Sequence, residues 1–321
     1  MSPYTRREFT KLALAALPAA GVLSSLNSLR AAAPAGKPNS KVNGVHIGLN
    51  VPYSFGPAVL SADDLLKNCV EVGVSGLELR TQPVEVFLGA PADLVNAKAA
   101  VAKGGAATNN AAKLREWRTG VDVSRAAEFR KKYEDAGLFI EIVKVDGIFR
   151  MSEAELDYVF KLGKALGARG LSTEIATAAT KVEDMTRVGS FADKHKLMIG
   201  YHGHTHTGPK DWEEAFALAK YNGANVDLGH YVAGLNMSPV AFIKERHDRI
   251  THVHVKDKKM HEGPAIPFGT GDTPIAEVLR LIRDNRWPIQ ATIEFEYKVP
   301  EGSTRMAEIA KCVQFCREAL A

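Results

Sequence analysis

The segment Leu197-Met-Ile-Gly-Tyr-His-Gly-His-Thr-His206 joins an apolar run to three alternating histidines, His202, His204 and His206. If the run is a β-strand, its two-residue period places the three imidazoles on one side of it. Imidazoles gathered at the end of a strand suggest a divalent-metal site. One polar strand end needs no such explanation, so the hypothesis depends on whether other strands end in the same way.

Three further apolar runs end in histidine or carboxylate side chains, and all three lie in the last third of the chain. They cover residues 225–230, 250–257 and 291–296. Repetition of this design favours one shared site over scattered polar residues. The polar residues at these strand ends and at the preceding one are Glu174, His202, His204, Asp227, His230, His252, His254, Lys256, Asp257, Glu294 and Glu296.

Strand and helix patterns alternate along the chain from about residue 42 to its end. We expect strands over residues 45–50, 76–80, 138–145, 170–175, 197–206, 225–230, 250–257 and 291–296. Eight strand–helix repeats predict a parallel (β/α)₈ TIM barrel, in which the carboxyl ends of the strands build the active site. An open doubly wound sheet is the alternative, but residues 45–56 lack the G-x-G-x-x-G fingerprint that such a sheet would favour.

The N-terminus has the pattern of a targeting segment. Thr5-Arg-Arg-Glu-Phe-Thr-Lys11 precedes an apolar run from residue 12 to residue 26, and an alanine-rich stretch follows. The paired arginines resemble a twin-arginine export signal. The run contains Pro18 and Gly21 and is shorter than a membrane span requires, so we expect no stable membrane anchor. The predicted organisation is a signal peptide over 1–35, a linker over 36–41 and a barrel over 42–321.

Composition and charge are those of an ordinary globular protein and do not favour a nucleic-acid partner. The 321 residues are 45% hydrophobic and 24% charged, which is ordinary for a globular protein. Three of the four net positive charges (+4) belong to residues 1–35, so the rest of the chain is nearly neutral. This balance gives no electrostatic argument for binding nucleic acid. Cys69, Cys312 and Cys316 are too few for a disulfide framework, and we expect them to be buried and unpaired.

Residues 82–121 form a segment that is longer than a normal barrel loop. The sequence leaves open whether it is a lid over the barrel mouth or a surface insertion. At the end of the third predicted strand, Lys144 and Asp146 are a further candidate pair for substrate contact.

The mixture of histidine and carboxylate suits Mn²⁺, Co²⁺, Zn²⁺ or Fe²⁺ better than Ca²⁺, which prefers oxygen ligands alone. Four motifs follow one another along the chain: Asp227-x-x-His230, His252-x-His-x-Lys-Asp257, Gly269-Thr-Gly-Asp-Thr-Pro274 and Ile293-Glu-Phe-Glu296. Their order resembles that of the xylose-isomerase-like TIM-barrel superfamily. This superfamily includes sugar-phosphate isomerases/epimerases, ketose 3-epimerases, inosose dehydratase and endonuclease IV, and subunits that cleave 3-keto-glycosides by elimination are also similar.

The resemblance implies one divalent metal ion held by Glu, Asp, His and Glu on the fifth to eighth strands. The matching positions hold His202, Asp227, His254 and Glu294. His202 departs from the family pattern, and with it the pair of glutamates that moves a proton between the two faces of the sugar in ketose epimerases is lost. Glu174 on the neighbouring strand could restore a carboxylate, as a ligand or as a base.

We therefore expect a periplasmic, metal-dependent lyase that acts on a keto-sugar or 3-keto-glycoside. Glu174 or a histidine (His202 or His204) would remove the proton next to the ketone, and His230 or Lys256 would assist the leaving group. A metal-dependent sugar isomerase or epimerase is the alternative, and a non-catalytic periplasmic sugar-binding protein is the alternative from another class. The expected partners are a carbohydrate and the twin-arginine export machinery, and the sequence leaves homo-oligomerisation open.

Overall fold

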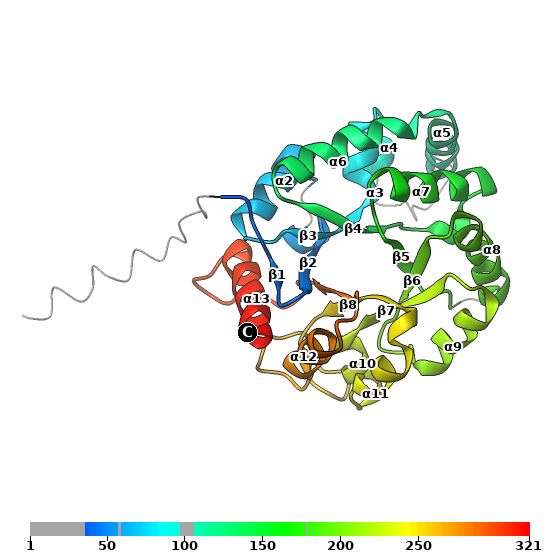
Figure 1. Ribbon diagram of the computed structural model, residues 1–321. Helices are drawn as coiled ribbons and strands as arrows, with labels where there is room; N and C mark the ends of the chain where they lie inside the picture. The colour runs from blue at the N-terminus through cyan, green and yellow to red at the C-terminus, as the bar shows by residue number, and fades with distance from the viewer. Residues whose placement is uncertain (1–35, 57–58, 97–105, 178) are drawn as a thin grey trace, which may run out of the picture. The chain divides into compact units, whose positions relative to one another are not determined.

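Eight parallel strands close into a barrel, as expected. The computed structural model describes residues 36–56, 59–96, 106–177 and 179–321. The strands pair in sequence order, and pairing of the first with the last closes the ring (Figure 1). They are β2 (Val45–Val51), β3 (Gly76–Arg80), β4 (Phe139–Lys144), β5 (Gly170–Glu174), β6 (Met198–His202), β7 (Asn222–Asp227), β8 (Ile250–Val255) and β9 (Gln290–Ile293), with the short β1 (Lys41–Val42) antiparallel to β2.

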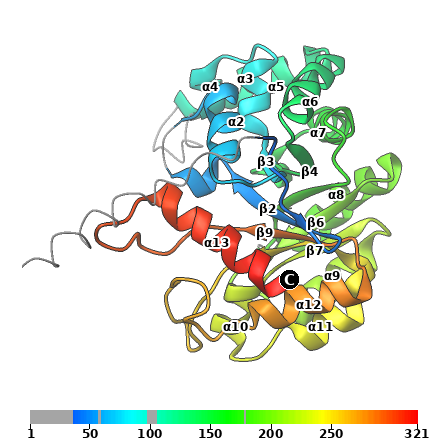
Figure 2. The ribbon, with the colours of Figure 1, turned by 60° about the vertical axis from the view of Figure 1, so that its left-hand side comes forward.

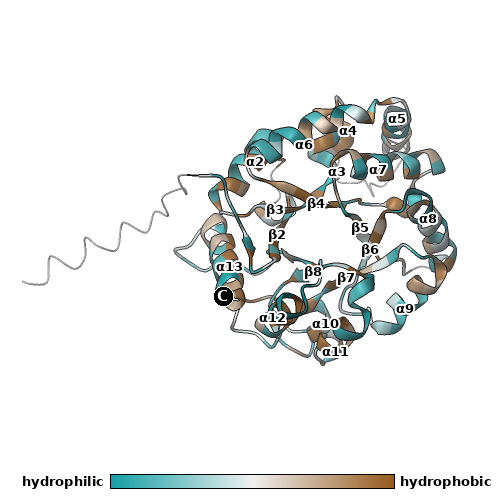
Figure 3. Ribbon diagram, in the orientation of Figure 1, coloured by the Kyte–Doolittle hydropathy of each residue, from teal (hydrophilic) through white to brown (hydrophobic). Residues whose placement is uncertain are grey.

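Helices surround the barrel and bury their apolar faces against the strands. Figures 1 and 2 show this outer ring, and Figure 3 shows hydrophilic and hydrophobic stretches alternating along its helices. The ring follows from amphipathic sequences, because each helix has an apolar stripe that only the sheet can cover. It comprises α2 (Ala62–Glu71), α6 (Ala126–Asp135), α7 (Glu153–Ala165), α8 (Lys181–His195), α9 (Pro209–Leu218), α11 (Val240–Arg246), α12 (Ile275–Asn285) and α13 (Arg305–Leu320).

Several helices begin at the caps that the sequence supplies. The Ser152 hydroxyl accepts from the backbone N–H of Glu155, and the Glu155 side chain accepts from the backbone N–H of Ser152, which completes a capping box at the start of α7. Ser61 caps α2 and Thr304 caps α13 through one such hydrogen bond each.

The last four predicted strands end two to four residues earlier than the sequence pattern suggests, and β8 and β9 end at Val255 and Ile293. β6 ends at His202, so His204 and His206 lie in the following loop, although their alternation continues the strand period. β7 ends at Asp227, and α10 (Leu228–Leu235) begins directly after it. The Asp227 carboxylate accepts from the backbone N–H of His230 at 2.7 Å and caps this helix, so His230 is helical and does not lie on a strand.

The segment over 82–121 adds helices to the outer ring. Its described part contains most of α3 (Thr81–Phe87), α4 (Ala92–Asn96) and α5 (Ala106–Gly120). Arg118 on α5 contacts Glu85 on α3 at 2.7 Å and Glu155 on α7 at 3.3 Å. The Trp117 and Tyr158 rings meet edge to face, with 6.2 Å between their centroids. These contacts fix α5 against α7.

The three cysteines are free and buried, which confirms that prediction. Among the described helices, none is long and apolar enough to cross a membrane. The predicted signal peptide, residues 1–35, lies outside the described residues.

Candidate active site and metal centre

The four residues predicted to bind a metal ion converge at the carboxyl ends of the last four strands. One possible ligand atom from each of His202, Asp227, His254 and Glu294 lies within 4.8 Å of those of the other three. His202 and Asp227 end β6 and β7, His254 lies in β8, and Glu294 directly follows β9. All four side chains are buried. Neighbouring parallel strands present their ends at one rim, so residues far apart in sequence become a single group.

This group, called the quartet below, has the free ligand atoms that a metal ion requires. His202 Nδ1, His254 Nδ1 and Asp227 Oδ2 are buried and make no hydrogen bond within the described structure. Two of them face charged groups instead, since Lys256 Nζ lies 3.1 Å from Asp227 Oδ2 and Glu294 Oε2 lies 3.3 Å from His254 Nδ1. Buried polar atoms normally have hydrogen bonds, so three such atoms that lack them at one place favour a ligand. Two imidazoles and two carboxylates suit Mn²⁺, Co²⁺, Zn²⁺ or Fe²⁺. The residues therefore fit a divalent ion.

Lys256 places a positive charge beside the quartet. Its Nζ lies 2.7 Å from Glu294 Oε2, 3.1 Å from Asp227 Oδ2 and 2.6 Å from Glu296 Oε2. Burial opposes the charged form of Lys256, but the three carboxylates outweigh it and raise the pKa of the ammonium. Burial also raises the pKa of Glu294, but Lys256 and His254 outweigh it, so the carboxylate pKa lies well below its usual value.

Glu78 and His252 lie beside the quartet, and both side chains are completely buried. Glu78 Oε2 is 2.5 Å from His254 Nε2, and Glu78 Oε1 is 3.3 Å from His252 Nε2. Burial raises the pKa of Glu78, but His254 and His252 outweigh it and hold the carboxyl ionised. Burial lowers the pKa of His254, whereas Glu78 and Glu294 raise it, to about 10. No role for Glu78 was predicted from the sequence, in which it is a single carboxylate between two leucines of a short strand.

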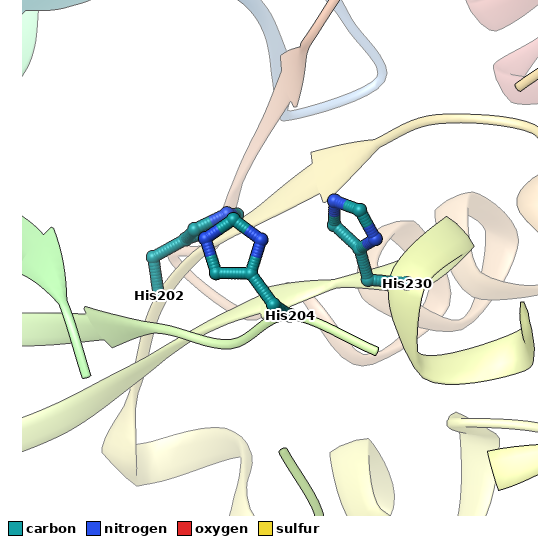
Figure 4. A group of neighbouring side chains, drawn as sticks. All are labelled: His202, His204 and His230. Atoms are coloured by element: carbon teal, nitrogen blue, oxygen red, sulfur yellow. The ribbon is translucent and has the colours of Figure 1, made fainter. Parts of the chain in front are cut away.

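Three imidazoles gather on the mouth side of the site (Figure 4). His202 comes from the end of β6, His204 from the following loop and His230 from the first turn of α10. The ring centroids of His202 and His204 are 4.8 Å apart, and those of His204 and His230 are 5.0 Å apart. His206 is exposed, and its ring stacks on that of His204.

Glu174 does not join the quartet but supports His204. One oxygen accepts from Lys144 Nζ at 2.7 Å, and the other lies 2.7 Å from His204 Nε2. Burial opposes ionisation of Glu174, but His204 and Lys144 outweigh it and lower its pKa strongly. The hydrogen bond to Glu174 raises the pKa of His204. Glu174 is therefore placed poorly to act as a base and well placed to orient one.

Lys144 and Asp146 separate in the structure. Lys144 contacts Glu174, whereas Asp146 accepts from Arg80 Nη1 at 2.6 Å and from Gln82 Nε2 at 3.1 Å. The Arg80 guanidinium lies 5.0 Å from the centroid of the Tyr53 ring. The Tyr53 hydroxyl donates to Glu296 at 2.7 Å. Asn50 donates to Glu294 at 2.8 Å. The ends of β2, β3 and β4 thus complete the rim of the site. The sequence pattern around Asn50, Tyr53 and Arg80 did not indicate that these residues belong to the rim.

Comparison with solved structures finds the same fold in other bacterial proteins. A xylose isomerase domain protein from Planctomyces limnophilus shares 13% identity and a TM-score of 0.58, over 86% of this chain and 96% of that chain. A xylose isomerase domain protein from Alicyclobacillus acidocaldarius has 14% sequence identity and a TM-score of 0.60, and the match covers 86% of this chain and 99% of that chain. A sugar phosphate isomerase/epimerase from Parabacteroides distasonis has 17% sequence identity and a TM-score of 0.55, and the match covers 85% of this chain and 93% of that chain.

No curated protein matches the chain. The sequence profile of the family described as xylose isomerase-like TIM barrel matches residues 159–319, which include the quartet and all three clustered imidazoles. The chain therefore belongs to the xylose isomerase-like TIM barrel family.

Proposed function

We propose that the protein is a divalent-metal-dependent lyase that removes a proton next to the ketone of a keto-sugar, such as a 3-keto-glycoside, and expels the glycosidic oxygen. The observation that carries the proposal is the position of the quartet beside an imidazole that a carboxylate orients. The quartet supports binding of one divalent ion. Such an ion would polarise the ketone and so make the neighbouring C–H bond more acidic.

His204 is the residue we assign as the base. Glu174 also faces the Lys144 ammonium, which only donates, so the ionised carboxylate accepts the hydrogen from His204 Nε2. That arrangement leaves His204 Nδ1 as an acceptor among the clustered rings. It is the arrangement that a general base requires, with one ring nitrogen fixed by a carboxylate and the other free to take a proton.

His230 is the residue we assign as the acid. An ammonium can only donate, so Lys256 Nζ donates to His230 Nε2 at 3.1 Å and leaves the ring hydrogen on Nδ1. His230 Nδ1 is buried and has no partner among the described residues. It can therefore donate to an oxygen of the substrate. Acceptor and donor belong to rings whose centroids are 5.0 Å apart.

The proposed reaction is balanced without a redox partner. His204 Nδ1 takes the proton from the carbon next to the ketone, and the electron pair of that C–H bond becomes the new C=C bond. The C–O bond to the aglycone breaks, and the departing oxygen takes the proton of His230 Nδ1 while the Lys256 ammonium passes a proton to His230 Nε2, so that the ring stays neutral. The products are an unsaturated keto-sugar and an alcohol.

The test uses the purified protein and a nitrophenyl 3-keto-glucoside. We expect release of nitrophenol that a chelator stops and that Mn²⁺, Co²⁺ or Zn²⁺ restores. The variant His204→Gln should retain the metal and lose at least about 100-fold in kcat. Metal binding without release of nitrophenol would contradict the lyase and favour isomerisation or epimerisation of a free sugar. Absence of metal binding would favour the non-catalytic sugar-binding protein.

We also propose that the protein acts in the periplasm after twin-arginine export. The support is the sequence of residues 5–11 and the apolar run that follows them. Replacing Arg6 and Arg7 by lysine should retain the protein in the cytoplasm, as cell fractionation would show. Export of this variant at the normal level would contradict the proposed route.

A further inference from the structure

Glu78 reaches the candidate metal centre across the interior of the barrel. It lies on β3, whereas His254 lies on β8, and β2 and β9 separate these two strands in the closed sheet. The contact between Glu78 Oε2 and His254 Nε2, at 2.5 Å, therefore passes through the interior. TIM-barrel interiors are usually filled by branched aliphatic side chains, so a buried carboxylate at this place requires a reason.

The contacts of Glu78 indicate which ring nitrogen of His254 carries the hydrogen. Its two oxygens face two imidazole nitrogens, Nε2 of His254 at 2.5 Å and Nε2 of His252 at 3.3 Å. Only the contact with His254 is a hydrogen bond, because Glu78 Oε1 and His252 Nε2 make none within the described structure. The ionised Glu78 carboxylate accepts the hydrogen of His254 Nε2. Thr251 Oγ1 lies 2.8 Å from the other nitrogen of His252. A single line of polar contacts thus runs from Thr251 through His252 and Glu78 to His254.

The contact of Asn225 with His254 would favour the other tautomer, with no hydrogen on Nε2. Asn225 Nδ2 lies 3.1 Å from the same His254 Nε2, and this amide could donate only if Nε2 carried no hydrogen. The carboxylate contact is shorter and involves a charged acceptor, and charge-assisted hydrogen bonds are roughly twice as strong as neutral ones. The contact with Glu78 therefore decides the tautomer.

We propose that Glu78 is a positioning residue that keeps a hydrogen of His254 on Nε2, so that Nδ1 is the nitrogen that gives up its proton and turns its lone pair towards the metal ion. His254 Nδ1 lies 3.3 Å from Glu294 Oε2 and 3.8 Å from Asp227 Oδ2, and it is buried without a hydrogen-bond partner among the described residues. The inference rests on the proposed function in one respect, that the quartet binds a divalent ion. A carboxylate behind a metal-binding imidazole typically strengthens metal binding by about 10- to 100-fold.

The experiment measures Zn²⁺ binding by isothermal titration calorimetry after removal of bound metal. Glu78→Gln keeps the size of the side chain and should weaken Zn²⁺ binding by about 10- to 100-fold. Glu85→Gln is the matched control, because Glu85 is also a buried carboxylate but lies on α3, where Arg118 pairs with it. This control should lose stability and keep the Zn²⁺ affinity of the unaltered protein.

A second measurement uses the unaltered protein, so it tests the proposed role of Glu78 even if Glu78→Gln does not fold. Nitrogen NMR of the Zn²⁺-loaded protein should show the His254 hydrogen on Nε2 and the metal on Nδ1. Metal on Nε2, or an affinity in folded Glu78→Gln equal to that of the unaltered protein, would overturn the role of Glu78 alone. Failure of the unaltered protein to bind Zn²⁺, Mn²⁺ or Co²⁺ would instead overturn the metal dependence of the proposed function.

Discussion

Glu174 illustrates how a carboxylate can serve chemistry without touching a metal ion. Both of its oxygens are occupied, one by Lys144 and the other by His204. The same pairing that makes it a weak base fixes the ring of His204 and leaves the other ring nitrogen of that residue free. A role in orienting His204 should therefore be separable from metal binding by substitution.

The variant Glu174→Gln should lower kcat by about 10- to 100-fold and leave the metal affinity unchanged. A neutral amide holds His204 less firmly than an ionised carboxylate does, because the charge-assisted hydrogen bond is lost. Steady-state kinetics with nitrophenyl 3-keto-glucoside, together with a metal titration, would measure both quantities. Loss of metal from Glu174→Gln would mean that Glu174 is a ligand, as the sequence left open.

At the scale of single elements, the loop after β6 positions His204. The backbone N–H of His204 donates to Thr207 Oγ1 at 3.1 Å, and the N–H of Thr207 donates to the backbone oxygen of His204 at 2.9 Å. Helix α10 packs directly on this loop, and a Cβ at Gly234 would lie 1.7 Å from the backbone oxygen of Thr205. The glycine is required there by close approach of two backbones.

Gly234→Ala should therefore destabilise the protein by about 1 to 3 kcal/mol and displace the loop that carries His204. We expect kcat to fall while the metal stays bound, because the quartet lies outside this loop. Gly120→Ala is the control, since a Cβ at Gly120 would meet no atom within 4 Å. Urea unfolding and kinetics would measure the two effects, and equal behaviour of the two variants would contradict the proposed packing constraint.

The elements that local patterns describe were predictable from the sequence. Alternation of apolar strands and amphipathic helices indicates the barrel, and the strand ends indicate the four residues that the structure brings together. The end of β6 was not predictable, because His204 and His206 continue the two-residue period beyond the last strand hydrogen bonds. Helix α10 was missed for a similar reason: its first residues, from Leu228, continue an apolar strand pattern.

Contacts across the whole barrel lie beyond local patterns. Glu78 and His254 are 176 residues apart and meet only because the barrel closes. The contributions of Asn50, Tyr53 and Arg80 to the rim have the same origin, since each residue alone resembles an ordinary polar strand end. Sequence reasoning therefore predicted the histidine-rich part of the mouth, at the ends of β6 to β9, and missed most of the part at the ends of β2 and β3.

At the scale of the whole molecule, an ionic cluster joins three strands towards their amino-terminal ends, whereas the proposed site lies at the carboxyl ends. Glu141 on β4 contacts His46 on β2 and Arg169, which precedes β5, with 3.0 Å between Arg169 Nε and Glu141 Oε2. Burial raises the pKa of Glu141, but the hydrogen bond with His46 and the charge of Arg169 outweigh it and lower that pKa from 4.5 to about 2. The lowered pKa means that the folded state binds the proton of Glu141 less tightly than the unfolded state does.

The stability that Glu141 contributes should be complete above pH 4.5 and should be lost as the pH falls towards 2. We expect Glu141→Gln to lower the free energy of unfolding by about 2 to 3 kcal/mol at pH 7 and by progressively less between pH 5 and pH 3.5. Urea unfolding across this range measures the difference, with Glu128→Gln on the exposed side of α6 as control. A difference that does not change with pH would show that Glu141 acts through packing.

Metal binding should also stabilise the entire barrel, because the quartet draws one residue from each of the last four strand ends. An ion that binds only the folded state, at 100 times its Kd, adds about 2.7 kcal/mol to the free energy of unfolding. For a chain of this size that should raise Tm by about 4 to 5 °C.

After removal of metal, we therefore expect Zn²⁺ or Mn²⁺ to raise Tm and a chelator to reverse the rise. Asp227→Asn keeps an oxygen that can accept from the His230 N–H, but it loses a charged ligand, so its Tm should no longer respond to metal. Asp157→Asn is the control, because Asp157 pairs with Lys161, Lys194 and His195 on the outer helices. This variant should unfold at a lower Tm and keep the full response to metal, whereas an equal response in Asp227→Asn would place the ion elsewhere.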